Sequence, residues 1–200
     1  MEVPEQLKDF RNFLYIVWKE LNLPDPTPIQ YEIASFMQSG DRRAIIQGFR
    51  GVGKSWICSA FVVHQLLLDP SKNILVVSAS KTRADDFSTF TLRIIHELDI
   101  LEHLRPKANQ RFSKISFDVG LAPASHAPSV KSLGVTSQLT GSRADIIVAD
   151  DVEVPNNSAT QSMRDKLSEQ IKEFDAILKP NDDSKVLVLG TPQCEDTIYY

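Results

Sequence analysis

Residues 48–55 of the chain read Gly-Phe-Arg-Gly-Val-Gly-Lys-Ser and match the pattern G-x-x-x-x-G-K-[S/T] at every fixed position. At average residue usage, about 1% of chains of this length match the pattern by chance. An apolar run at 44–47, predicted to be a buried strand, precedes this stretch, and a predicted helix at 54–68 follows it. Strand, glycine-rich turn and helix in this order are the setting in which the pattern forms a phosphate-binding loop, the P-loop.

The residue types of this loop suit a bound triphosphate. Glycines allow backbone N–H groups to turn inward around an anion, and the start of the following helix adds the positive end of its dipole. Lys54 is expected to reach the β- and γ-phosphates of ATP, and the Ser55 hydroxyl to bind Mg²⁺. The alternative is a glycine-rich turn without a ligand. The residues expected to surround the nucleotide are Gly48, Phe49, Arg50, Gly51, Val52, Gly53, Lys54 and Ser55.

Arg50 lies inside the loop, four residues before the lysine. A guanidinium at this place could lie beside the γ-phosphate and stabilise the charge of the transition state, as an arginine finger does. The alternative is a loop arginine that pairs with a surface carboxylate. Both interpretations stay open at the level of the sequence.

A second motif follows the apolar run at 146–149, where the chain continues with Asp150, Asp151, Val152 and Glu153. An apolar strand that ends in carboxylates is the Walker B pattern, in which the first acid holds Mg²⁺, usually through water. Asp150 is expected in that role. The next acid polarises the attacking water. Asp151 occupies the adjacent position, and Glu153 is the competing candidate; a solvated acidic turn is the alternative to both.

The pattern along the chain predicts an α/β fold with a mainly parallel central sheet covered by helices. Short apolar runs alternate with helical patterns, and residues 105–140 predict an insertion with a β-hairpin and loops. We divide the chain into an N-terminal helical segment, 1–40, and a core, 41–200. The predicted strands are 44–47, 73–78, 146–149 and 185–189, and the predicted helices are 5–21, 29–37, 54–68, 81–98 and 158–179, with a further helix beginning at 194.

Composition excludes several classes of protein. With 42% hydrophobic and 24% charged residues, the chain of 200 residues is neither disordered nor fibrous. Two cysteines without Cys/His spacing exclude a disulfide framework and a zinc site, and no apolar run approaches about 18 residues, the length needed to span a membrane. The first residues lack the features of a signal peptide. The net charge of −4 argues against coating of nucleic acid by bulk charge, although residues 81–143 carry nine basic and six acidic residues.

Three further segments carry weaker signals. The amide of Gln30 could read both the donor and the acceptor of an adenine edge. Hydroxyls and basic groups at 78–83 could contact a nucleic-acid backbone, and a polar group in Gly190-Thr191-Pro192-Gln193 could sense the γ-phosphate. An ordinary surface glutamine and ordinary loops are the alternatives.

These motifs, in this order, resemble the ATPase domain of the large terminase subunit of tailed bacteriophages, particularly the short-tailed podovirus type. The resemblance covers nearly the whole chain. Its more specific parts are Leu139-Thr140-Gly141-Ser142-Arg143-Ala144-Asp145 before the acidic strand and Leu189-Gly190-Thr191-Pro192-Gln193. It implies a RecA-like P-loop NTPase fold of the ASCE type and a motor that packages viral DNA into a procapsid by hydrolysing ATP.

The resemblance also implies roles and partners. Gln30 would contact adenine, Arg50 and Lys54 the phosphates, and Asp150 the Mg²⁺, while Asp151 or Glu153 would act on the water. Thr191 would couple hydrolysis to movement, and Arg143 is a candidate arginine finger acting on a neighbouring subunit. The implied partners are double-stranded DNA, the portal protein and the small terminase subunit. The protein would form a ring when assembled and a monomer when isolated, in the host cytoplasm and transiently on the portal, without membrane contact and without a place in the mature virion.

One departure concerns the length of the sequence. The large subunit of the resembled family continues into the rest of the ATPase region and then into an RNase H-like nuclease, whereas this sequence ends at Tyr200. We therefore expect an ATPase core that is incomplete at its carboxyl end and no nuclease activity from this chain.

Other functions remain as competitors. A superfamily-2 helicase domain shares the glutamine, the P-loop and the acidic strand, but calls for a DEAD-type box, where this chain has Asp-Asp-Val-Glu. A GTP-dependent switch calls for an [N/T]-K-x-D motif, which is missing from the sequence. A nucleotide-binding assembly module without turnover fits the same motifs.

Overall fold

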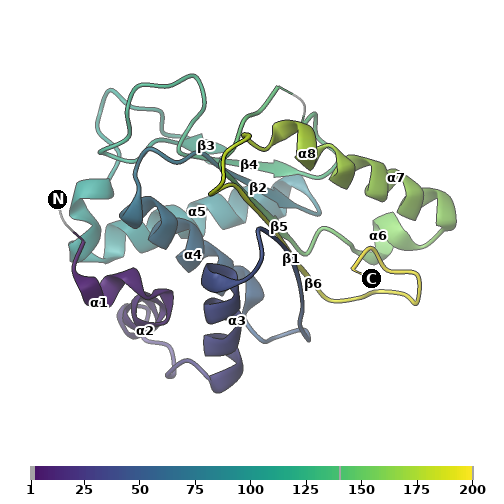
Figure 1. Ribbon diagram of the computed structural model, residues 1–200, viewed down its shortest axis with the longest axis horizontal. Coiled ribbons are helices and arrows are strands. Elements are labelled where there is room, and N and C mark those ends of the chain that lie inside the picture. Colours follow the sequence, from purple (N-terminus) through teal and green to yellow (C-terminus); the bar gives the residue numbers. More distant parts are fainter. Residues whose placement is uncertain (1–2, 140, 200) are drawn as a thin grey trace.

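The computed structural model describes residues 3–139 and 141–199. A six-stranded sheet with the order β1-β6-β5-β2-β4-β3 forms the centre of the molecule (Figure 1). Five neighbouring strands are parallel, and the short edge strand β3 is antiparallel to β4. The predicted α/β fold with a mainly parallel sheet is therefore confirmed. The strands are β1 (Arg43–Gln47), β2 (Ile74–Ser78), β3 (Ser116–Phe117), β4 (Val130–Gly134), β5 (Ile146–Asp150) and β6 (Lys185–Gly190).

The region 105–140 contributes to the central sheet as well as to a hairpin. Ser116–Phe117 pairs with the beginning of β4, as a β-hairpin would. However, all five residues of β4 also pair in parallel with β2, so this strand belongs to the core and not to an insertion. Its residues alternate between buried and half-buried, a pattern that also fits a surface hairpin. This correction adds one parallel strand to the four that the sequence predicts.

Helices cover both faces of the sheet (Figure 1). The larger group is α1 (Glu5–Lys8), α2 (Phe10–Glu20), α3 (Pro28–Ser39), α4 (Lys54–Leu68), α5 (Lys81–Glu97) and the 3₁₀ helix η1 (Asp99–Leu104). The smaller group on the other face is α6 (Pro155–Ser158), α7 (Gln161–Lys172) and α8 (Phe174–Ile177). The single helix predicted at 158–179 is thus divided into shorter pieces. None of the helices among the described residues is long and apolar enough to cross a bilayer.

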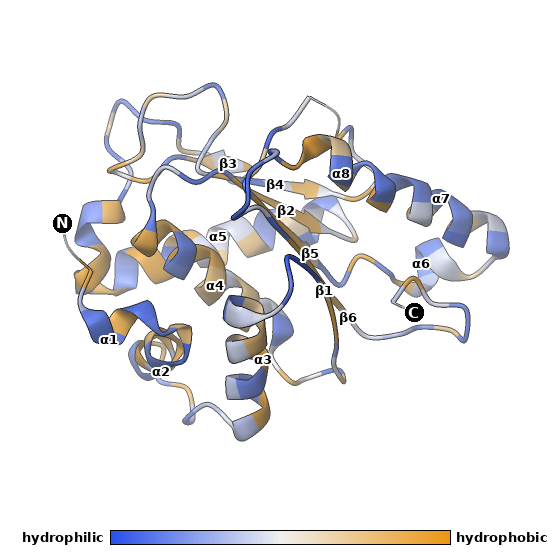
Figure 2. Cartoon of the chain, viewed as in Figure 1, coloured by the Kyte–Doolittle hydropathy of each residue, from blue (hydrophilic) through white to orange (hydrophobic). Residues whose placement is uncertain are grey.

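Alternating residues of the strands belong to two separate hydrophobic clusters, one on each face of the sheet. Ile74 and Val76 of β2 face the cluster that includes α2 to α5, whereas Leu75 and Val77 face the cluster under α7 and α8. The strands are accordingly apolar along their length, while α7 presents a hydrophilic outer side to solvent (Figure 2). Burial on both faces explains the continuous apolar runs of β2, β5 and β6. β1 lies at the edge of the sheet and is buried on one face only, with Ile45 47% exposed, so the prediction of a fully buried strand at 44–47 is wrong for the other face.

The parallel strands bring several loops to one edge of the sheet. The P-loop follows β1, Asp150 is the last residue of β5, and Thr191 follows β6, the strand that lies between them. The carboxyl ends of parallel strands are where ligands bind in open α/β sheets. Residues 194–199, predicted as the start of a helix, instead form turns that pack back toward this edge.

Candidate nucleotide-binding site

The P-loop has its glycines where the backbone requires them. Gly51 and Gly53 have φ angles of 94° and 89°, in the left-handed region that side chains rarely adopt. Gly53 also caps the N-terminus of α4, and a Cβ atom on it would lie 3.1 Å from Nε2 of Gln30. The glycine-rich loop therefore leads directly into the N-terminus of a fifteen-residue helix, an arrangement that binds phosphate in proteins.

Lys54 is buried in the centre of this loop and is held by neutral oxygen atoms. Its Nζ donates to the carbonyl oxygens of Gly48 at 3.0 Å and Phe49 at 3.3 Å, and to Oγ1 of Thr191 at 2.9 Å. Thr191 in turn donates to the carbonyl oxygen of Gly48 at 2.7 Å. The closest carboxylate recorded for this ammonium group is Asp151, at 3.9 Å. An anionic phosphate would give the ammonium group a partner of opposite charge in place of neutral carbonyls.

Asp150 has the features of a metal ligand. The carboxylate is buried, its Oδ1 has no hydrogen-bond partner among the described residues, and the Ser55 hydroxyl lies beside it. Burial raises the pKa of Asp150 to about 6, against the opposing effect of the Ser55 hydrogen bond. A free carboxylate oxygen beside a hydroxyl is the donor set that Mg²⁺ prefers. The residues present therefore fit a magnesium ion held by Ser55 and Asp150.

The two candidate acids have different surroundings. Asp151 has a positive φ angle of 46°, unusual for a residue with a side chain, and its N–H donates to the carbonyl oxygen of Leu189 at 2.8 Å. Its side chain is 33% exposed and lies toward Lys54. Glu153 is 1% exposed, and its carboxylate accepts hydrogen bonds from residues 193–198. Asp151 thus faces the P-loop, whereas Glu153 is bound by the segment after β6.

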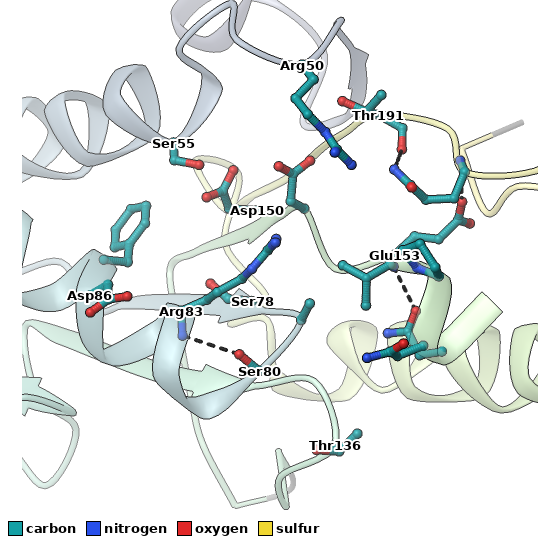
Figure 3. Close-up of a pocket in the computed structure, with 18 of the residues that line it drawn as sticks. Arg50, Ser55, Ser78, Ser80, Arg83, Asp86, Thr136, Asp150, Glu153 and Thr191 are labelled. Carbon is teal, nitrogen blue, oxygen red and sulfur yellow. Dashed lines mark hydrogen bonds between the residues drawn. The ribbon is translucent and has the colours of Figure 1, made fainter. Parts of the chain in front are cut away.

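A pocket of about 940 Å³ opens in front of these residues. Arg50 enters it from the P-loop and Arg83 from the first turn of α5, on opposite sides of Asp150 (Figure 3). The positive charge of Arg83 lowers the pKa of Asp150, although burial has the larger effect and raises it. Two guanidinium groups around a lysine-containing loop make this pocket suitable for a polyanion.

Arg83 is a site residue that sequence reasoning did not single out. Hydroxyls and basic groups at 78–83 could contact a nucleic-acid backbone on the sequence alone, and in the structure Ser78, Ser80 and Arg83 line the same pocket as Asp150. The available signal is the position of Arg83 just after a parallel strand, at the edge where the other strands place the P-loop and Asp150.

Gln30 and Arg143 lie outside the pocket's lining. Gln30 Nε2 donates to the carbonyl oxygen of Val52 at 2.9 Å, and its Oε1 accepts from the N–H of Thr27 at 2.9 Å, so its amide joins the start of α3 to the P-loop. Arg143 precedes β5 and therefore lies at the opposite edge of the sheet, where it donates to the carbonyl oxygen of Ala176 at 2.8 Å. The structure does not bring Arg143 to the P-loop of its own chain. Thr140, part of the same motif, lies outside the described residues.

The parallel sheet, the loop after its first strand and the buried acid at the end of β5 define a RecA-like P-loop domain. Residues 45–196 match the family described as "Terminase large subunit, T4likevirus-type, N-terminal". The chain belongs to this family of large terminase subunits.

Sequence comparison agrees with the family. The chain is 56% identical over 199 residues to the "Terminase, large subunit" of Enterobacteria phage T3, a match that covers 98% of this chain and 34% of that protein. The chain thus spans about a third (34%) of the length of this curated relative.

Solved structures agree with the fold. The large terminase of bacteriophage HK97 superposes with a TM-score of 0.59 at 12% identity, over 92% of this chain and 37% of that one. The large terminase ATPase domain of Thermus phage P74-26 gives a TM-score of 0.53 at 16% identity, over 88% and 68% of the two chains. At these identities the likeness concerns the fold.

Proposed function

We propose that this chain hydrolyses ATP and uses the energy to move viral double-stranded DNA into a procapsid. The observation that carries the proposal is the meeting of Lys54, Thr191 and the Asp150–Asp151 pair at one edge of the sheet, in a chain of the large terminase family. The relative in phage T3 is named a large terminase subunit, which supports the same activity. Double-stranded DNA, the portal protein and the small terminase subunit are the proposed partners of an assembled ring in the host cytoplasm.

The proposed roles follow from the contacts. Lys54 leaves the carbonyl oxygens of Gly48 and Phe49 and binds the β- and γ-phosphates, while Arg50 neutralises charge that develops on the γ-phosphate. The Asp151 carboxylate accepts a hydrogen bond from the attacking water and orients it, since this side chain is partly exposed and faces the P-loop.

Ser55 and Asp150 are the proposed holders of Mg²⁺, which supplies Lewis-acid stabilisation of the phosphate oxygens when bound. Gln30 is the proposed adenine contact; to reach a base, its amide exchanges its present bonds to Thr27 and Val52. We keep the division at residue 40: the N-terminal segment supplies Gln30, and the core from residue 41 carries the phosphate chemistry.

DNA-stimulated ATP hydrolysis tests the proposal, measured on the chain alone and with portal and procapsid. Lys54→Ala should abolish turnover because it removes the ammonium group at the centre of the loop. Lys107→Ala, at an exposed position, is the matched control and should keep the rate of the parent. Hydrolysis by the Lys54 variant at the parent's rate would mean that the site is assigned wrongly.

The competing functions give other outcomes in the same assay. A nucleotide-binding assembly module would bind ATP tightly and show no turnover under any of these conditions. A helicase-type ATPase would be stimulated equally by single-stranded DNA and would separate strands. The family match over 45–196 is the observation that favours packaging over strand separation.

A further inference from the structure

Glu153 is a buried carboxylate whose recorded hydrogen bonds all come from neutral donors. Its two oxygens accept from the N–H of Gln193 at 3.0 Å, from Oγ1 of Thr197 at 2.9 and 3.0 Å, and from the N–H of Ile198 at 2.9 Å. Burying a carboxylate costs free energy unless hydrogen-bond donors surround it. The hydrogen bonds that offset this cost also hold the donors, and with them the segment after β6, in place. In Figure 3 the carboxylate points away from Ser55 and toward the segment after β6.

Tyr199 adds further contacts between this segment and the strand ends. Its phenol oxygen accepts the N–H of Glu153 at 3.3 Å, and its backbone carbonyl accepts Nε2 of Gln47 at 2.7 Å. The phenol lies so close to Gly190 that a Cβ atom there would come within 2.0 Å of it. The segment 193–199 is therefore packed against the ends of β1, β5 and β6 together.

The segment also reaches the P-loop lysine. Gln193 Nε2 donates to the backbone carbonyl of Thr191 at 2.8 Å, and Oγ1 of Thr191 accepts from Lys54 at 2.9 Å. Glu153 is thus linked to Lys54 through two residues, Gln193 and Thr191, each of which makes one contact with its backbone and one with its side chain. A phosphate that binds Lys54 therefore lies next to the hydroxyl of Thr191, at the end of this set of contacts.

We propose that Glu153 is a positioning residue for the reaction: its carboxylate ties the segment 193–199 to the end of β5 and thereby holds Thr191 beside Lys54. The inference rests on the proposed ATPase function. It separates the two acids by role, with Asp151 acting on the water and Glu153 acting through Gln193 and Thr191. Because Thr191 contacts the lysine directly, the same bonds transmit nucleotide binding from the P-loop to the chain after β6.

Steady-state kinetics of Glu153→Gln and Thr197→Val separate positioning from catalysis, because Thr197 bonds to Glu153 without lining the pocket. As a positioning pair, both variants should lower kcat for ATP about tenfold with KM changed less than twofold. The double variant should be no slower than the slower single variant, because both changes break the same contact. Glu195→Gln, an exposed glutamate on the same segment, is the matched control and should keep the parent's kcat.

The opposite pattern would overturn the inference. If Glu153 orients the water, Glu153→Gln should lose more than about 10³ in kcat, while Thr197→Val keeps the parent rate. If Glu153→Gln fails to fold, Thr197→Val alone decides, since an unchanged kcat in that variant contradicts the positioning role.

A second measurement does not depend on turnover. Addition of Mg²⁺ with a non-hydrolysable ATP analogue should change the hydrogen exchange of the Gln193 and Ile198 amides in the parent but not in Lys54→Ala. Failure of the parent to bind the analogue would contradict the proposed function. Binding without any change at Gln193 and Ile198 would contradict the inference and leave the ATPase function standing.

Discussion

The buried carboxylate of Asp150 destabilises the nucleotide-free fold at neutral pH and is at the same time suited to bind a metal ion. Its pKa rises from 3.8 to about 6 because the carboxylate is buried. A carboxyl group with a raised pKa stabilises the fold fully only below pH 3.8, and this contribution is lost as the pH rises through about 6. At neutral pH the nucleotide-free fold therefore carries the cost of an ionised group that suits a cation.

Asp150→Asn should separate these two effects. The neutral amide should raise the free energy of unfolding at pH 7.5 by up to about 3 kcal/mol in the absence of nucleotide. The same variant should lose Mg²⁺-dependent nucleotide binding, because a hard cation binds an amide oxygen less well than a carboxylate. Urea unfolding with and without Mg²⁺ and ATP measures both. A variant less stable than the parent at this pH would contradict the assigned cost of burial.

Arg83 should contribute to binding of the phosphates from α5. Arg83→Ala should weaken Mg²⁺–ATP binding about 10- to 100-fold, the loss expected for a charge-assisted hydrogen bond. Lys81→Ala removes an exposed positive charge from the same helical turn and should leave affinity unchanged. Equal affinities of the two variants, measured by titration with a fluorescent nucleotide, would remove Arg83 from the site.

At the scale of helices and strands, the sequence predicts the elements whose conformation depends on residues close together in the chain. The P-loop, the helix at 54–68 and the strand that ends in Asp150 are predicted from the sequence because glycine conformation and apolar runs are written into short stretches. The residues of β4 are expected in a hairpin because Pro, Gly and Ser surround short stretches of alternating apolar residues in 105–140. Its parallel partner, β2, lies more than fifty residues earlier in the chain, and no local pattern reports such a pairing.

The conformation of the segment 194–199 likewise depends on residues that are distant in the sequence. Its sequence suggests the beginning of a helix, but Thr197 bonds to Glu153, a residue 44 positions earlier. Arg83 enters the site in the same way, through the topology of the sheet, whereas Gln193 belongs to the segment 190–193 that the sequence already marks as a possible sensor of the γ-phosphate. The candidate residues inside the two motifs can thus be predicted from the sequence, whereas the contacts that distinguish Asp151 from Glu153 depend on distant parts of the chain.

The packing of the N-terminal helices on α4 should make stability depend on pH. His64 of α4 lies against the rings of Phe10 and Phe13, and its Nε2 is 2.9 Å from the carbonyl oxygen of Leu7. Burial lowers the pKa of His64 from 6.5 to about 4, so the folded state keeps this ring neutral. Because the unfolded chain binds the proton more readily, stability present above pH 6.5 is lost as the pH falls to about 4.

Unfolding of His64→Leu across this pH range tests the effect. The parent should lose about 3 kcal/mol more than the variant between pH 6.5 and pH 4, which corresponds to the shift in pKa. Phe13→Leu disturbs the same cluster without changing a titratable group and should keep the pH dependence of the parent. Identical pH profiles for His64→Leu and the parent would exclude His64 as the cause.

At the scale of the whole molecule, Arg143 lies at the amino end of β5, and the P-loop lies at the carboxyl edge of the sheet. An arginine in that place could serve the site of a neighbouring subunit in a ring, where such a residue is worth about 10³ to 10⁵ in rate. The alternative is a local role, since its guanidinium already bonds to the carbonyl oxygen of Ala176.

Mixed assemblies distinguish the two roles of Arg143. Arg143→Ala and Lys54→Ala should each be inactive alone, yet mixing them under assembly conditions should restore part of the ATP turnover. Recovery is expected because some interfaces then pair an intact P-loop with an intact arginine. Mixed rings that assemble without recovering any turnover would eliminate the role in trans.

The order of the strands also sets a length. β6 separates β1 from β5, and at a spacing of about 4.8 Å between neighbouring strands, the end of β5 lies about 10 Å from the end of β1. The P-loop closes this gap, because Ser55 at the start of α4 lies beside Asp150 and Lys54 Nζ lies 3.9 Å from a carboxylate oxygen of Asp151. The two proposed magnesium ligands therefore come from strands that are not neighbours in the sheet. A shift of the loop after β1 relative to β5 would change the distance between them, even with every strand intact.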